Sequence, residues 1–272
     1  MRRLRILGVI ASLAVASAAQ ALGGVASHPA PAPAAPAPPQ FQSPSNLKAR
    51  QVVQQAIAAL GGPAYLHFRG RRGQGHLFTF NLRGQLANPG TVFWSYYRYP
   101  DAERIELTKH RNVIYIYNGR HGWNVNFRGV TPLGPSVMRR FRQAQAHSLD
   151  AILRKWAENP RTLMLYHGAN LATARPVEKV SFYAAGGLSA TVSFSVQTHL
   201  PLEVSWRTHN PYTGGFSRKS VTFGNYQPFD GIETPLVVES YEGAIPRQEE
   251  YFTSIHYGPL PAKLFEPPAR RR

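Results

Sequence analysis

The sequence contains no cysteine among its 272 residues. This absence excludes disulfide bonds, thiolate zinc sites, iron–sulfur clusters, cysteine nucleophiles and a lipid anchor on an N-terminal cysteine. Acidic residues are also few, with 14 Asp and Glu against 31 Lys and Arg, so the formal net charge is +17. Charged residues make up only 17% of the chain and hydrophobic residues 43%, which is too apolar for a disordered basic protein such as a nucleic-acid tail.

Hydrophobic runs of membrane-spanning length are missing as well. The apolar stretch from Ile6 to Ala19 is shorter than the roughly 20 residues that a spanning helix needs. Arginines precede it and Ala19-Gln20-Ala21 follows it, the pattern of a secretory signal peptide cleaved after Ala21. A retained membrane anchor is the alternative interpretation. We expect residues 1–21 to be a signal peptide and the mature protein to be periplasmic, away from nucleic acid.

An alternating Pro/Ala tract follows the expected signal peptide. His28 to Gln40 reads HPAPAPAAPAPPQ, which forms neither a helix nor a central strand and favours an extended polyproline conformation. We therefore divide the chain into a signal peptide (1–21), a Pro/Ala-rich linker (22–42), one folded domain (43–267) and a basic tail (268–272).

Two segments of the expected domain have helical spacing. Ser45 to Leu60 has apolar residues at helical intervals, with Ser45 as the expected N-cap, and Gly61-Gly62-Pro63 ends it. A second helical region is predicted from Ser136 to Asn159, with a restart at Ser148.

The rest of the domain alternates with period two, as half-buried antiparallel strands do. Turn signals such as Asn118-Gly119 and Asp230-Gly231 separate the runs. One antiparallel sheet with this many strands must curl or close. The predicted strands are Gly73–Arg83, Val92–Tyr99, Arg104–Lys109, Val113–Tyr117, Trp123–Phe127, Pro176–Ala184, Leu188–Val196, Leu200–Arg207, Ser217–Tyr226, Pro235–Tyr241 and Gln248–Tyr257.

The order of these pieces resembles the LolA/LolB-like superfamily of periplasmic lipoprotein carriers, over roughly Ser45 to Pro267. The motifs that carry the resemblance are Ala59–Gly62, Tyr99-Pro100-Asp101, Asn118-Gly119, Gly122-Trp123, Thr198–Leu202, Asn225-Tyr226, Asp230-Gly231-Ile232, Thr234-Pro235 and Leu264–Pro267.

The resemblance implies a mainly β fold, in which a curled antiparallel sheet of about eleven strands forms an incomplete barrel and helices act as lid or plug. It also implies that the concave face holds acyl chains. The arginine near the cavity of these carriers cannot be assigned here, because many arginines compete for the role. The long helical insertion and the basic C-terminus depart from a standard carrier.

Aromatic side chains at period two supply a candidate wall for such acyl chains. Each buried CH₂ group contributes about 0.8 kcal/mol, so an apolar wall holds a lipid without a catalytic group. Ordinary core packing is the alternative for each residue, because the sequence does not show which face is concave. The candidates are Phe78, Phe80, Trp94, Tyr96, Trp123, Phe127, Phe194 and Trp206.

The helical insertion carries a cluster of basic residues, Arg139, Arg140 and Arg142. If the insertion is the lid, these side chains are candidates for contact with anionic head groups or a membrane surface. A solvated helix face is the equally open alternative.

No set of residues with catalytic spacing is present in the sequence. The three aspartates sit in turns or at a helix start, no serine lies in G-x-S-x-G, and no H-E-x-x-H occurs. The glycine-rich run Gly70 to Gly75 lacks the Lys-Ser/Thr of a P-loop and precedes a strand, so we interpret it as a bend or bulge. We expect no enzyme activity, no cofactor and no metal.

The function expected from these observations is non-catalytic carriage of lipid or lipoprotein acyl chains by a monomer in the periplasm. The main alternative is an envelope protein-interaction or stress-sensing module on the same fold. An outer-membrane barrel is disfavoured because helices interrupt the chain and many strand faces carry charge.

Overall fold

The computed structural model describes residues 43–170, 175–209 and 214–268. The expected signal peptide, the linker and all of the expected tail except Pro268 lie outside these ranges. None of the helices described is long and apolar enough to cross a bilayer. The helical elements are α1 (Pro44–Ala59), α2 (Pro63–His67), α3 (Pro135–Ala146), α4 (Leu149–Ala151), a π-helical turn (Ile152–Trp156) and two 3₁₀ turns (Ala185–Gly187 and Ala262–Phe265).

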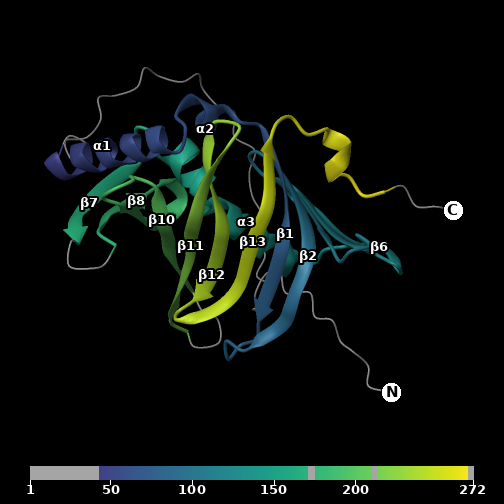
Figure 1. The fold of residues 1–272 in the computed structure, drawn as a ribbon. Coiled ribbons are helices and arrows are strands. Elements are labelled where there is room, and N and C mark those ends of the chain that lie inside the picture. The colour runs from purple at the N-terminus through teal and green to yellow at the C-terminus, as the bar shows by residue number, and fades with distance from the viewer. Residues whose placement is uncertain (1–42, 171–174, 210–213, 269–272) are drawn as a thin grey trace, which may run out of the picture.

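Thirteen antiparallel strands form a single curled sheet (Figure 1). The spatial order is β6-β5-β4-β3-β2-β1-β13-β12-β11-β10-β9-β8-β7. Every pair of adjacent strands in the sheet is therefore consecutive in sequence, except for the β1–β13 pair, which joins distant segments. The strands are β1 (Gly70–Phe80), β2 (Leu86–Arg98), β3 (Ala102–Leu107), β4 (Val113–Asn118), β5 (His121–Asn126), β6 (Gly129–Pro132), β7 (Leu163–Asn170), β8 (Val177–Tyr183), β9 (Ser189–Ser195), β10 (Pro201–His209), β11 (Phe216–Phe229), β12 (Ile232–Glu242) and β13 (Ile245–Tyr257).

The sheet does not close, because β6 and β7 are its two edges and do not pair with each other. The predicted mainly β, incomplete barrel is therefore confirmed. The predicted number of strands was about eleven, and the two that were missed are the edge strands β6 and β7.

Helix α1 begins slightly earlier than predicted, because Ser43 rather than Ser45 is the N-cap. The Ser43 hydroxyl accepts a hydrogen bond from the Asn46 amide at 3.2 Å. Ser45 instead accepts from the Tyr166 amide on β7 at 3.0 Å, and the Asn46 side chain donates to the Met164 carbonyl at 3.1 Å. The start of α1 thus satisfies edge groups of β7, which would otherwise be open to pairing with another strand.

Helix α1 packs against the strands from β7 to β10, and its buried face (Ala49, Val52, Val53 and Ala56) joins the largest hydrophobic core. Gly61 ends the helix at a φ of +118°, and a Cβ there would lie 2.3 Å from the Gly231 carbonyl oxygen. Only glycine permits this approach to the β11–β12 turn. Pro63 does not merely end a helix as predicted, because it is the first residue of α2.

The second helical segment connects the two edges of the sheet, since α3, α4 and the π-helical turn lie between β6 and β7 in sequence. In Figure 1, α3 lies behind β13 and β1, across the concave side of the sheet. The predicted restart is confirmed, because the Ser148 hydroxyl accepts from the Ala151 amide at 3.1 Å. Arg154 fixes the π-helical turn by donating to the carbonyls of Leu66 at 3.1 Å and Phe68 at 2.9 Å.

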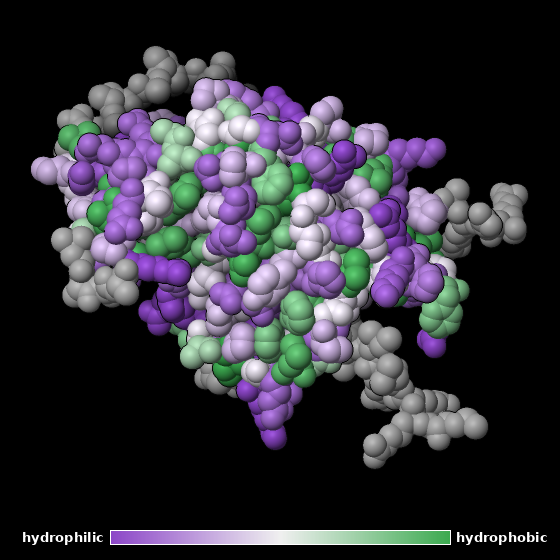
Figure 2. Space-filling view, viewed as in Figure 1, coloured by the Kyte–Doolittle hydropathy of each residue, from purple (hydrophilic) through white to green (hydrophobic). Residues whose placement is uncertain are grey.

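The opposite, convex face is partly covered by the C-terminal 3₁₀ turn. Phe265 of this turn is fully buried with Ala102 and Ile116, and Arg104 donates to the Leu264 carbonyl at 3.2 Å. Over the face shown in Figure 2, hydrophobic and hydrophilic residues are interspersed.

The glycine-rich run in β1 is a bulge, as predicted. The register against β13 shifts between Gln74 and Gly75, and a Cβ on Gly75 would lie 1.9 Å from the Tyr251 carbonyl oxygen. The run is part of a strand and presents no helix N-terminus to a phosphate.

Candidate functional site

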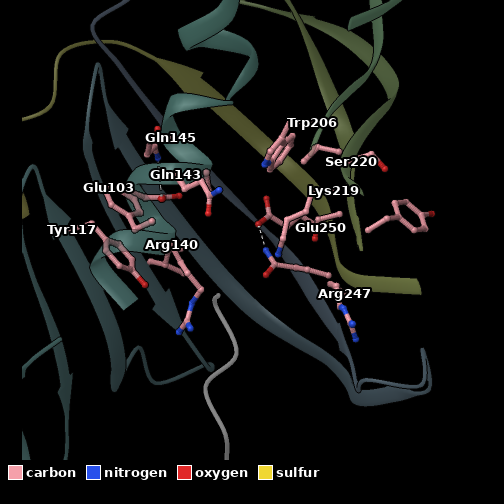
Figure 3. Close-up of a pocket in the computed structure, with 17 residues that line it drawn as sticks. Glu103, Tyr117, Arg140, Gln143, Gln145, Trp206, Lys219, Ser220, Arg247 and Glu250 are labelled. Atoms are coloured by element: carbon pink, nitrogen blue, oxygen red, sulfur yellow. Dashed lines mark hydrogen bonds between the residues drawn. The ribbon is translucent and has the colours of Figure 1, made fainter. Parts of the chain in front are cut away.

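A cavity lies between α3 and the concave face of the sheet (Figure 3). We call this 280 Å³ space the α3 chamber. The helix contributes one wall, and strands from both halves of the sheet contribute the other. Its lining residues are Glu103, Ile105, Tyr117, Arg140, Phe141, Gln143, Ala144, Gln145, Trp206, Lys219, Ser220, Val221, Ser240, Tyr241, Arg247, Gln248 and Glu250.

A second space of 240 Å³ adjoins it beneath α2 and α4, and we call it the α2 chamber. Ala144, Trp206, Val221 and Glu250 line both chambers, so the two share one boundary. Together their volumes fall in the range of roughly 300–1,000 Å³ that is typical of small-molecule sites.

The α2 chamber has the more continuous apolar wall. Its apolar side chains come from the end of α1 and from strands β10 to β13, and they are Leu60, Val204, Val221, Phe223, Ile232, Val238 and Phe252. These residues alternate along their strands with side chains on the opposite face, as the period of a strand requires. The arrangement can bury hydrocarbon over a length of several strands.

Trp206 stands at the boundary of the two chambers. Its ring stacks on His147, with centroids 4.9 Å apart and planes 14° apart. Its indole nitrogen is buried and, within the described ranges, has no hydrogen-bond partner. In Figure 3 this nitrogen faces the space between Gln143 and Glu250. A buried donor without a partner costs about 1–3 kcal/mol, so an acceptor from a ligand would be favoured here.

Helix α3 rests on the sheet through few side chains. Phe141 stacks on Tyr117 of β4, and Met138 and Phe141 are the buried residues of the helix. Two amide side chains add polar contacts: Gln143 donates to the Thr208 hydroxyl at 2.9 Å, and Gln145 donates to Glu103 at 3.5 Å. Only two of the 12 residues of α3 are therefore buried.

Two carboxyl groups face the interior, Glu103 from β3 and Glu250 from β13. Burial, and then the neighbouring charge of Glu250, raise the pKa of Glu103 to about 7, although Arg71 and Gln145 act in the opposite direction. Burial also raises the pKa of Glu250, whose carboxylate accepts a hydrogen bond from Gln248 at 2.6 Å. Near neutral pH Glu103 is therefore partly protonated, and the pKa of Glu250 lies above that of an exposed carboxyl group.

Basic groups surround the α3 chamber at its other end. Lys219 on β11, Arg247 on β13 and Arg140 on α3 all line it. Glu242 lies 4.0 Å from the Lys219 ammonium and 3.2 Å from the Arg247 guanidinium. Burial lowers the pKa of Lys219; Glu242 raises it, and the charges of Arg247 and Arg140 lower it further. The α3 chamber therefore combines interior carboxyl groups with a positively charged rim, and the apolar wall lies in the adjoining α2 chamber.

Arg71 of β1 is the basic residue inside the α2 chamber. Its guanidinium lies 5.8 Å from the centre of the Tyr97 ring, and Asp150 and Tyr257 line the same chamber. No arginine was assigned to the cavity from the sequence; in the structure, Arg71 lines the α2 chamber. The β1–β13 pairing that brings it beside Tyr257 joins segments too distant for any local pattern to reveal.

The structure distributes the eight candidate wall residues over both faces of the sheet. Trp206 lines both chambers, and Phe194 lies on the same face but is fully buried in the core beneath α1. Tyr117 faces the α3 chamber, so its neighbours Ile116 and Trp123 face the other way. Trp94 and Tyr96 alternate with Phe93 and Tyr97 and lie on that same convex face.

The other three candidates also lie outside the chambers. Phe78 contacts Tyr251 edge to face at 5.8 Å on the convex side, and Phe80 is half-buried near the β1–β2 turn. Phe127 is 87% exposed in the turn after β5. Alternation showed that these side chains share a face with their neighbours, but not which face is concave.

Of the three basic candidates on the insertion, Arg140 lines the α3 chamber, whereas Arg139 and Arg142 are exposed to solvent. Glu103 and Glu250 were not among the residues singled out from the sequence. A signal was present: each of the two shares its strand face with an apolar residue two positions on, Ile105 and Phe252.

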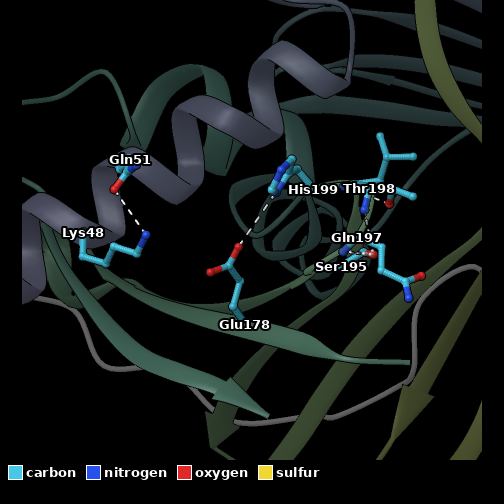
Figure 4. A network of polar contacts seen from close by, with 8 residues as sticks. Lys48, Gln51, Glu178, Ser195, Gln197, Thr198 and His199 are labelled. Carbon is cyan, nitrogen blue, oxygen red and sulfur yellow. Dashed lines mark hydrogen bonds and ion pairs between the residues drawn. The ribbon is translucent and has the colours of Figure 1, made fainter. Parts of the chain in front are cut away.

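A separate polar network lies at the β8 and β9–β10 side of the molecule (Figure 4). His199 lies 4.0 Å from Glu178, but the nearby Ser195 hydroxyl accepts hydrogen bonds from the amides of Gln197 and Thr198 at 3.2 and 3.1 Å. Ser195 thus serves a turn rather than a base-activated nucleophile. Across the described ranges, no cluster of three or more His, Asp or Glu side chains is placed to hold a metal ion.

No protein-family model matches the sequence, and no curated protein sequence matches it. Solved structures do match. A LolA superfamily protein from Nitrosomonas europaea is 10% identical, with a TM-score of 0.52 over 80% of this chain and 97% of its own. A DUF1329 family protein from Desulfovibrio piger is 13% identical, with a TM-score of 0.56 over 80% and 97%.

A domain from Vibrio parahaemolyticus, named for outer membrane lipoprotein sorting, is 10% identical and has a TM-score of 0.52 over 80% of this chain and 96% of its own. At these identities the likeness is one of fold. It extends over nearly the whole length of each of the three structures, so the architecture is shared as a unit and not as a fragment.

Proposed function

Because the chain has the LolA-like fold, in a divergent form, we propose that it is a non-catalytic binding or carrier protein for the acyl chains of a lipid or lipoprotein. The observation that supports the proposal most is the pair of adjoining chambers, whose shared boundary carries a buried indole N–H without a partner in the described ranges.

The hydrocarbon part of the ligand occupies the α2 chamber. Each CH₂ group moved from water into this apolar lining contributes about 0.8 kcal/mol, so a chain of several carbons binds without any covalent step. The volume of 240 Å³ accommodates part of one acyl chain, and the adjoining α3 chamber extends the space.

The ester or amide carbonyl of the ligand lies at the boundary of the chambers. There the Trp206 indole N–H donates to it, which removes the cost of the buried donor. Glu250 lines both chambers, as Trp206 does, and its protonated form is a second donor there.

Helix α3 acts as the lid over this cavity. Its small buried face makes it the wall that separates from the sheet at the lowest cost, whereas the π-helical turn is held by four buried residues, Ile152, Leu153, Arg154 and Trp156. A ligand therefore enters between α3 and the strands.

The proposed location is the periplasm, reached through the N-terminal signal sequence and its cleavage after Ala21. Lipids and acylated proteins of the envelope are the available ligands there.

Lipid extraction tests the proposal. The protein is purified from its native compartment without detergent, denatured in organic solvent, and the extract is analysed by mass spectrometry. We expect an acylated molecule in a stoichiometric amount. If the extract holds none and no acylated probe binds, the proposal fails; a stable protein partner recovered without lipid would favour the interaction-module alternative.

A further inference from the structure

Three elements far apart in sequence bring a positive side chain to the rim of the α3 chamber. Arg140 comes from α3, Lys219 from β11 and Arg247 from β13. Figure 3 shows Arg140 and Arg247 on opposite sides of this end of the cavity, with Lys219 between them. Such a convergence is not required by the fold, since each strand has many other positions for a basic residue.

One carboxylate serves two of these cations. Glu242 lies 4.0 Å from the Lys219 ammonium and 3.2 Å from one Arg247 nitrogen. The second terminal nitrogen of Arg247 donates to the Asn81 carbonyl at 3.0 Å, and its Nε is buried with no partner in the described part of the chain. Two of the three rim cations, Lys219 and Arg247, therefore share one carboxylate.

The carboxyl groups deeper in the chamber do not cancel this charge fully. Glu103 and Glu250 are held by hydrogen bonds from Gln145 and Gln248, and burial favours their protonated forms. The chamber thus passes from a positive rim to an interior of carboxyl and amide groups, and then to the apolar wall of the α2 chamber.

We propose that the rim formed by Arg140, Lys219 and Arg247 binds the phosphate of a phosphate-bearing amphiphile whose acyl chain lies in the adjoining chambers. This inference rests on the proposed acyl-chain function and adds the head-group class. Arginine and lysine side chains are the usual partners of phosphate oxygens, and a guanidinium with an uncommitted N–H suits them well.

Two probes with the same acyl chain test it: lysophosphatidic acid, which carries a phosphate monoester, and the matching uncharged monoacylglycerol. Calorimetric titration of the full chain is expected to show tighter binding of the phosphate-bearing probe, with the difference shrinking at high salt. Lys219→Met keeps the aliphatic stem and is expected to weaken lysophosphatidic acid binding about fivefold without changing monoacylglycerol binding.

Two further variants keep the test falsifiable. Glu242→Gln removes the competing carboxylate and is expected to tighten lysophosphatidic acid binding. Arg128→Gln, on an exposed turn outside both chambers, removes the same charge as Lys219→Met and is expected to change nothing. Circular dichroism confirms that each variant is folded.

The outcomes separate the two claims. Equal affinity for both probes, or equal effects of Lys219→Met and Arg128→Gln, overturns the head-group inference and leaves the acyl-chain function standing. Binding of inorganic phosphate with no gain from the acyl chain assigns the rim to a free anion and overturns the inference as well. Failure of both acyl probes to bind contradicts the proposed function itself.

Discussion

The phenol ring of Tyr117 on β4 lies stacked on the ring of Phe141 on α3, with centroids 4.2 Å apart and planes 12° apart. Both rings are buried, and both line the α3 chamber. The pair is therefore an apolar contact through which α3, the helix that covers the cavity, packs on the sheet. It links the stability of α3, the proposed lid, to the same surface that a ligand would contact.

Phe141→Ala is expected to release α3 from the sheet. Loss of a buried phenylalanine costs about 3 kcal/mol, and here the cost falls mainly on the closed position of the helix. Hydrogen exchange measured by mass spectrometry should show faster exchange in residues 135–146 and little change in α1. Arg139→Ala on the exposed side of the same helix is the control and should leave exchange unchanged. Equal protection in Phe141→Ala and wild type would show that the ring pair does not hold the lid.

Trp206→Phe removes the indole N–H and keeps an aromatic ring. If that N–H donates to a ligand carbonyl, the affinity for an ester-containing acyl probe falls about fivefold, the value of one hydrogen bond of about 1 kcal/mol. Trp123→Phe alters the convex face and is expected to leave the affinity unchanged. The measurement is a calorimetric titration of each variant with one monoacylglycerol. Equal effects of the two substitutions would remove Trp206 from the binding site.

Glu103 makes the stability of the fold depend on pH. Its pKa is raised from 4.5 to about 7 by burial and by Glu250, so the folded state holds a proton that the unfolded state releases. Ionisation of Glu103 therefore lowers the free energy of unfolding. This loss of stability is absent below pH 4.5, grows as the pH rises, and is complete above pH 7. The groups that face this carboxyl are Glu250, Arg71, Gln145, Tyr97 and Tyr117.

Glu103→Gln removes the titrating group and keeps an acceptor for Gln145. We expect the variant to match wild type at pH 4 and to be more stable by about 2–3 kcal/mol at pH 8. Urea unfolding of both proteins from pH 4 to pH 8 gives the difference. A constant difference over this range would mean that Glu103 does not titrate as described.

Local patterns in the sequence were enough to predict most of the sheet. In β9, Ala190, Val192 and Phe194 alternate with polar residues, and all three are buried as the alternation indicates. The missed strands lack that signal: β6 has only four residues, and β7 contains Gly168 at a φ of +86°, where its pairing with β8 shifts. At the β7 edge, the start of α1 supplies hydrogen bonds that a neighbouring strand would otherwise give.

The site was harder to predict than the fold because its residues meet only through tertiary structure. Glu103 and Glu250 lie on strands separated in the sheet by β2 and β1. The direction in which the sheet curls decides whether the face of Trp206 or the face of Trp123 is concave. The alternation of apolar and polar residues along the strands is the same for either direction. A charged residue on an otherwise apolar strand face, as at Glu250 beside Phe252, was the usable sign.

The most direct test of the central claim is to block the cavity and measure acyl-chain binding. Ala144 on α3 lines both chambers and lies on the lid, so Ala144→Phe fills the boundary without disturbing the core of the sheet. Val237→Phe is the control, because Val237 precedes Val238 of the α2 chamber on β12 and so lies on the convex face. Titration with the fluorescent fatty acid cis-parinaric acid should show saturable one-to-one binding to wild type and to Val237→Phe, and a loss of at least tenfold in affinity for Ala144→Phe. Undiminished binding to Ala144→Phe would contradict the claim that acyl chains occupy the space between α3 and the concave face.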